Sequence, residues 1–133
     1  MTRSLYERLG GVDKITEIVS ETLELHLKNP LVSPRFRHAI ARLAAAHSGD
    51  EAAARAKLKR VTVEFFSAGS GGPHSYTGRS MRDTHAGMNI SEQEFVAVVD
   101  DIVAAMDKVG VGPEEKNEVV AILFSLKSDI IRI

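Results

Sequence analysis

Glycine and proline divide this chain into stretches whose apolar residues recur every three or four positions. The breaks stand at positions 10–11, 29–30, 69–73 and 110–113. Between them no segment alternates apolar and polar residues with a period of two, which is the pattern of a half-buried strand. A spacing of three and four residues places apolar side chains on one face of an α-helix. The sequence therefore predicts an all-α fold of amphipathic helices.

The breaks also mark the ends of the predicted helices. Pro30 cannot continue the hydrogen-bond ladder of the helix before it, whereas Pro113 suits the first turn of the helix after it. Ser91 and Glu94 have the spacing of a capping box, in which each side chain binds the backbone amide of the other residue. We expect long helices over residues 11–28, 50–68, 91–109 and 113–130, a short helix over 81–86, and a short segment over 31–36 followed by a less regular stretch over 37–49.

The composition excludes several classes of protein. The 133 residues are the size of one domain, and 17 basic against 18 acidic residues give a net charge of −1, without the basic excess of nucleic-acid binding proteins. No apolar run approaches the roughly 20 residues that span a bilayer. Cysteine is absent, so disulfides, iron–sulfur clusters and the attachment of c-type haem are excluded. We expect one cytoplasmic domain over residues 1–133 that binds neither nucleic acid nor membrane.

The histidines are the candidate chemical groups of this chain. No two of them lie three or four residues apart, so no pair on one helix makes a zinc site. His85 differs from the others because Met81 and Met88 share its helix face, four residues before it and three after it. Such an imidazole suits one side of a flat apolar ligand, and the alternative is a buried histidine bonded to a carbonyl. The other four are His26, His38, His47 and His74.

Three stretches of the chain carry motifs at fixed distances from one another. Residues 4–11 read Ser-Leu-Tyr-Glu-Arg-Leu-Gly-Gly. Further on, residues 71–73 read Gly-Gly-Pro and residues 76–81 read Tyr-Thr-Gly-Arg-Ser-Met, with His85 following. In this order, and with two amphipathic helices after them, these motifs resemble the group I truncated haemoglobins. The resemblance covers nearly the whole chain except about residues 37–52.

The resemblance implies a globin-like fold, a two-over-two helical sandwich around non-covalent haem b, with an inserted segment between the short third helix and the distal helix. His85 would ligate the iron through neutral imidazole and leave the opposite position to a diatomic gas. Core packing explains Phe65, Phe95 and Ile122 equally well, and Arg79 could also be a solvated charge. The implied haem contacts are Met81, Met88, Tyr76, Arg79, Phe36, Leu58, Thr62, Phe65, Leu23, Phe95 and Ile122.

The distal side departs from the family's pattern. Leu23 stands where the family usually has a tyrosine that hydrogen-bonds oxygen, and Leu58 and Thr62 stand at its usual polar positions. Of these three side chains, only the Thr62 hydroxyl can donate a hydrogen bond. Oxygen bound to haem carries partial negative charge, which an apolar wall does not stabilise. We therefore expect fast oxygen release.

The remaining histidines leave further alternatives. The connection before the distal helix is longer than the family's and contains His38 and His47, which could offer a sixth iron ligand, as could a deprotonated lysine of the distal helix. The alternative is two surface histidines on an inserted helix. His26 borders the apolar face of its helix and is expected to be a satisfied core residue. His74 lies in a Gly/Pro loop and is expected to be solvated.

Three functions are compatible with these residues. The first is reversible binding of oxygen, nitric oxide or carbon monoxide at a His-ligated haem. The second is a haem enzyme, a nitric-oxide dioxygenase or weak peroxidase served by an outside reductase, against which the missing distal tyrosine weighs. The third is a haem-free globin-like interaction module. Retention of His85, Tyr76 and Arg79 together weighs against that third function.

Overall fold

The protein, as described by a computed structural model over residues 3–133, is built from helices. Within those residues the β structure is limited to one parallel bridge between Ile90 and Ile131. The all-α prediction is confirmed. Among the helices of residues 3–133, none has the length and apolar character needed to cross a membrane. The elements are α1 (Leu5–Leu9), α2 (Gly11–Lys28), α3 (Ser33–Ala45), α4 (Glu51–Gly69), α5 (Met81–His85), α6 (Glu92–Val109), α7 (Pro113–Ser125) and the 3₁₀ helix η1 (Lys127–Asp129).

The ends of α1 and α6 follow the signals read from the sequence. The Ser91 hydroxyl accepts from the Glu94 amide at 3.0 Å, and the Glu94 carboxylate accepts from the Ser91 amide at 3.0 Å, so the predicted capping box is confirmed. Gly10 and Gly110 end α1 and α6 with φ angles of 104° and 90°. Glycine adopts this left-handed conformation without the steric penalty that a Cβ brings.

The less regular stretch expected over residues 37–49 is wrong for most of its length. Helix α3 runs without a break from Ser33 to Ala45. Its buried face consists of Ile40 and Ala44, which pack with Ala54 of α4. The sequence indicated only a possible helical turn at Ile40, Leu43 and Ala44, because two buried residues are too few to show the periodicity of a whole helix. Residues 37–52, where an insertion was expected, thus form most of α3, a turn and the start of α4.

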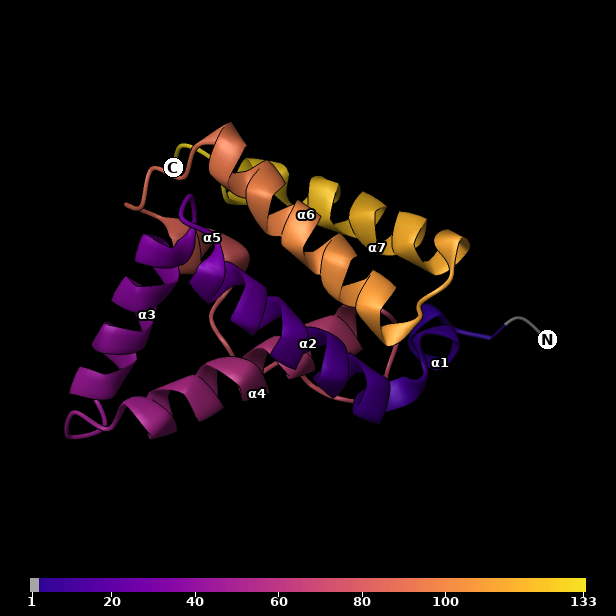
Figure 1. Ribbon diagram of the computed structural model, residues 1–133, viewed down its shortest axis with the longest axis horizontal. Coiled ribbons are helices and arrows are strands. Elements are labelled where there is room, and N and C mark those ends of the chain that lie inside the picture. Colours follow the sequence, from indigo (N-terminus) through magenta and orange to yellow (C-terminus); the bar gives the residue numbers. More distant parts are fainter. Residues whose placement is uncertain (1–2) are drawn as a thin grey trace.

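Helix α2 runs through the middle of the molecule (Figure 1) and packs against α4 and α6. In Figure 1, α6 and α7 lie side by side above it, and α4 lies below it. Helices α3 and α4 form a hairpin whose turn extends away from the other helices (Figure 1). The short α5 packs on η1. The last helix ends at Ser125, five residues before the predicted end, and η1 continues the chain.

The central core lies between α2 and α6, and α1 and α7 complete it. Ile15 and Met106 are fully buried at 0 % exposure, and Ile18 is 2 % exposed. These side chains belong to one apolar cluster to which α1 and α7 also contribute. Its other buried members are Leu5, Leu9, Val19, Ile102, Ala105 and Val119.

Truncation of Met106 tests how much this core contributes to the stability of the fold. Met106→Ala is expected to lower the free energy of unfolding by about 2–5 kcal/mol, because it removes buried surface and leaves a cavity. Val96, which is 38 % exposed on the same helix, is the matched control, and Val96→Ala is expected to cost about 0.5 kcal/mol or less. Urea unfolding of the apoprotein measures both. Equal losses would contradict the placement of the core.

Candidate functional site

His85 is the last residue of α5, and its ring is held by its own helix. The Ser80 hydroxyl caps α5 by accepting from the Asp83 amide at 3.1 Å. His85 is half-buried, and its Nδ1 donates to the Met81 carbonyl at 2.7 Å. With the proton on Nδ1, Nε2 carries a lone pair and is an acceptor or a metal ligand. The carbonyl-bonded alternative and the ligand alternative therefore use different nitrogens of the same ring.

The loop after His85 is tied to α3 and α6 by Arg35. Arg35 Nη1 donates to the Met88 carbonyl at 2.8 Å. The same guanidinium forms a bidentate pair with Glu94, with Nε–Oε2 at 2.7 Å and Nη2–Oε1 at 3.2 Å. Met81 and Met88 are both half-buried beside the histidine segment. Thus three helices, α3, α5 and α6, meet at this loop.

The Arg35–Glu94 pair has a clear electrostatic effect. The hydrogen bond from Arg35, helped by the hydrogen bonds from Ser91 and opposed by burial, lowers the pKa of Glu94 to about 2. The same bond raises the pKa of Arg35. The Glu94 side chain is 15 % exposed, so the pair is partly shielded from solvent.

The loop between α4 and α5 is docked on α4. The Phe65 and Tyr76 rings meet edge to face with centroids 5.4 Å apart. Glu64 Oε1 accepts from the Thr77 amide at 3.1 Å and from the Thr77 hydroxyl at 2.6 Å. The Tyr76 hydroxyl donates to the Arg79 carbonyl at 2.5 Å. These contacts fix the loop that leads into α5.

Arg79 is exposed beside this loop, and its side chain bonds to α5. Its Nη2 donates to the Asp83 carbonyl at 2.6 Å. One of the five N–H groups of the guanidinium is used in this way, and the others can meet a carboxylate. The arrangement is compatible with both readings of Arg79, the propionate contact and the surface charge.

The three residues predicted for the distal side lie on α2 and α4. Leu23 is buried at 9 % exposure on α2. Leu58 and Thr62 are half-buried on α4, one turn apart. The Thr62 hydroxyl donates to the Leu58 carbonyl at 2.7 Å. Since a hydroxyl carries one proton, this bond leaves Thr62 an acceptor toward anything that faces it.

His26 is a satisfied core residue, as predicted. It is 4 % exposed, and its Nδ1 lies 2.8 Å from Asp101 Oδ2 on α6. Burial lowers the pKa of His26, and the hydrogen bond that its ring donates to Asp101 opposes that shift. Its ring stacks on Phe36 with centroids 4.4 Å apart and planes 19° apart. Phe36 therefore packs at the junction of α2 and α3.

His38 and His47 are exposed, in agreement with the alternative of two surface histidines. The expectation of a solvated His74 is wrong. His74 is half-buried, with Nδ1 2.7 Å from the Ser67 hydroxyl. The reason is the turn after α4, where the Gly72 amide donates to the Ser67 carbonyl at 2.8 Å and folds the loop back on the helix.

The last two predicted pocket residues also take part in core packing. Phe95 of α6 is 4 % exposed and meets Phe124 of α7 edge to face with centroids 5.3 Å apart. Ile122 of α7 is half-buried and packs against the central core. Leu58 likewise packs on the cluster around Ile40 and Ala44. Apolar packing alone accounts for these positions, with or without a cofactor.

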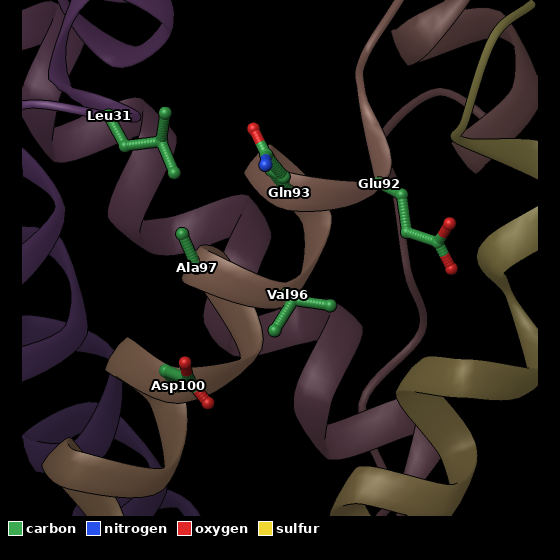
Figure 2. Close-up of a pocket in the computed structure, with 6 residues that line it drawn as sticks. All are labelled: Leu31, Glu92, Gln93, Val96, Ala97 and Asp100. Atoms are coloured by element: carbon green, nitrogen blue, oxygen red, sulfur yellow. The ribbon is translucent and has the colours of Figure 1, made fainter.

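A separate groove lies on the outer face of α6. Figure 2 shows Leu31, from the connection between α2 and α3, across from side chains of the first turns of α6. The groove contains no histidine, and none of its residues is among the predicted haem contacts. Within residues 3–133 no cluster of three or more His, Cys, Asp or Glu side chains could hold a metal ion. The groove is lined by Leu31, Glu92, Gln93, Val96, Ala97 and Asp100.

Residues 4–132 match the family described as bacterial-like globin. The chain is 32 % identical over 127 residues to a group 1 truncated hemoglobin of Mycolicibacterium paratuberculosis. The aligned region covers 96 % of this chain and 83 % of that protein. It is 26 % identical over 129 residues to a group 1 truncated hemoglobin of Tetrahymena pyriformis, covering 97 % and 95 % of the two chains.

Solved structures show the same fold. The truncated hemoglobin of Tetrahymena pyriformis in its Fe(III) form superposes with a TM-score of 0.84 at 22 % identity, covering 98 % of this chain and all of that one. The 2/2 hemoglobin of a Synechococcus species, described in the cyanomet state with covalently attached heme, gives 0.79 at 25 % identity over 97 % and 98 % of the chains. The predicted two-over-two helical sandwich is confirmed.

Sequence reasoning missed the polar side chains that hold the site together. Arg35 and Glu94 are 59 positions apart and His26 and Asp101 are 75 apart. Glu94 was identified as a capping residue, which it is, but nothing in one sequence pairs it with an arginine of a distant helix. The sequence does show an arginine directly before Phe36. Its partners cannot be predicted until the position of α3 relative to α6 is known.

The lowered pKa of Glu94 predicts a pH-dependent contribution to stability. The folded value of about 2 lies below the unfolded value of 4.5, so the contribution is present above pH 4.5 and is lost as the pH falls toward 2. Glu94→Gln is expected to cost about 1–2 kcal/mol at pH 7 and progressively less below pH 4.5. Urea unfolding of both proteins across this range measures the difference in their free energies of unfolding. A difference that stays constant with pH would contradict the ion pair.

Proposed function

The chain belongs to the bacterial-like globin family, within the group 1 truncated haemoglobins, and on that premise we propose that it holds haem b through His85 and binds diatomic gases reversibly. The observation that carries the proposal is the free Nε2 of His85, with Nδ1 donating to the Met81 carbonyl at 2.7 Å. Bound haem would supply an iron able to bind a diatomic gas, and His85 would hold that iron. We propose that this takes place in a single cytoplasmic domain.

The residues around His85 fit such a cofactor. A neutral imidazole with its second nitrogen bonded to a carbonyl is the usual form of a histidine that ligates a metal. Met81 begins α5 and Met88 lies in the turn after it, beyond the end of the helix; both are half-buried and offer apolar, polarizable surface to a flat ring. Arg79 retains N–H groups for a propionate, and the Tyr76 ring, held against Phe65, supports the loop that carries it.

The distal residues favour release of the gas over its chemical conversion. Leu23 and Leu58 have no polar hydrogen, and the Thr62 hydroxyl already donates to a backbone carbonyl. The pocket wall of this chain therefore presents no free donor from these three residues to a ligand with negative charge. Efficient nitric-oxide dioxygenation with an outside reductase depends on retaining oxygen, so this wall supports a binding protein over that enzyme.

Removal of His85 tests the ligand assignment. Wild-type protein reconstituted with haem is expected to show a strong Soret band, and His85→Ala is expected to lose it, since no other imidazole is held at that position. His47→Ala, at an exposed position, is the matched control and is expected to keep the band. Added imidazole should restore haem binding to His85→Ala in part. A His85→Ala protein with an unchanged Soret band would overturn the assignment.

A tyrosine placed at position 23 tests the distal wall. Leu23→Tyr is expected to slow oxygen dissociation by about 10-fold to 100-fold, because a hydrogen bond to a charged acceptor contributes about 1.5–3 kcal/mol. The control is Leu23→Phe, since phenylalanine has nearly the volume of tyrosine but lacks the hydroxyl. It is expected to leave the rate of oxygen dissociation close to that of the wild type. Stopped-flow mixing with dithionite and carbon monoxide measures the rates. Slow release from the wild-type protein would show that another donor reaches the ligand.

A further inference from the structure

Helix α5 is too short to fix the direction of His85 by itself. It has five residues, and none of them is buried. A single helical turn is unstable in isolation, because helix nucleation fixes several dihedral angles for each hydrogen bond that it gains. The orientation of the imidazole must therefore depend on how the chain is held on either side of α5.

The loop that leaves α5 is held from one side by the C-terminal residues. The Gly87 amide donates to the Ile133 carbonyl at 3.0 Å, and the Arg132 amide donates to the Ile90 carbonyl at 3.0 Å. Ile90 also forms the parallel bridge with Ile131. These contacts run along one side of the loop and leave the Met88 carbonyl to a different partner.

That partner is Arg35, which holds the loop from the side of α3. Its Nη1 donates to the Met88 carbonyl, three residues beyond His85, while Nε and Nη2 are fixed by Glu94 at the start of α6. Glu94 is itself fixed by the Ser91 amide in the capping box. A planar guanidinium with both ends bound has little freedom to turn. The Met88 carbonyl is thus held at a defined place relative to α3 and α6.

Resting on the proposed function, we propose that Arg35 is a positioning residue for His85: by holding the Met88 carbonyl it fixes the loop after α5 and, with it, the direction of the imidazole that ligates haem iron. The helix that carries Arg35 also carries Phe36, which stacks on His26 of α2. A movement of α3 would therefore change the position of the loop after His85 through the side chain of Arg35. Arg35 touches neither iron nor gas and acts through the loop.

Three variants separate this role from simple stabilisation. Arg35→Gln removes both bonds. Arg35→Lys keeps a positive charge opposite Glu94 but cannot hold Glu94 and the Met88 carbonyl together, because an ammonium is a point charge without a rigid fork. Arg8→Gln is the matched control: Arg8 forms a comparable bidentate pair with Glu118 between α1 and α7, far along the chain from α5.

The first readout is the haem pocket of the reconstituted proteins. Both Arg35 variants are expected to lose haem to an acceptor apoglobin about 10-fold faster than the wild type, as is typical when support of a metal-ligating histidine is removed. Resonance Raman spectra of their ferrous forms are expected to show a shifted or broadened iron–histidine band. Arg8→Gln is expected to keep the wild-type rate and band even if it lowers stability. Arg35 variants that match Arg8→Gln would overturn the proposal.

The second readout needs no haem and covers the case of poor reconstitution. Amide hydrogen exchange of the apoproteins is expected to be faster over residues 86–91 in both Arg35 variants and unchanged there in Arg8→Gln. Unchanged exchange in the Arg35 variants would overturn the tether. If the wild type itself takes up no haem, the proposed function fails, whereas a haem-binding wild type with insensitive Arg35 variants refutes this inference alone.

Discussion

The proposed haem site depends on one constraint, that a helix of a single turn must hold the imidazole of His85 in a fixed direction. The Nδ1 bond to the Met81 carbonyl selects the tautomer and limits rotation of the ring. It cannot place the helix, because α5 buries none of its residues. Placement comes from η1 and the C-terminal residues on one side and from Arg35 of α3 on the other, and these elements rest in turn on the packed core between α2 and α6. The chemical group and the packing that supports it therefore belong to different parts of the chain.

The sequence predicted the elements whose ends are marked and whose apolar stripe is wide. Helices α2 and α6 match the predicted ranges within a residue or two, because Gly, Pro and the Ser91 capping box act locally. It failed for α3, whose buried face is Ile40 and Ala44 alone. The motif before His85 identified the family, but the family pattern could not show that the Thr62 hydroxyl bonds its own helix.

The polar contacts were beyond local reasoning for a different reason. The pair of Arg35 and Glu94 forms only once α3 and α6 are packed. In the sequence each of the two is an ordinary charged residue of the kind found at exposed helix positions. The same holds for His26, whose burial was predicted but whose partner, Asp101, was not. Burial follows a pattern of single residues, whereas a hydrogen bond needs two residues and the geometry between them.

Helices α3 and α4 pack together on a second apolar cluster, and α4 also packs on the central core through Val63 and Phe66. The second cluster contains Ile40, Ala44 and Ala54, with Leu27 of α2 and Leu58 joining it at the edge. Regions with small cores open at a lower free-energy cost than the whole molecule. The second cluster, far smaller than the central core, is therefore expected to open more readily than the central core. Because Leu58 packs on this second cluster and also lies in the proposed distal wall, such opening would create a path by which a small molecule could reach the proposed haem site.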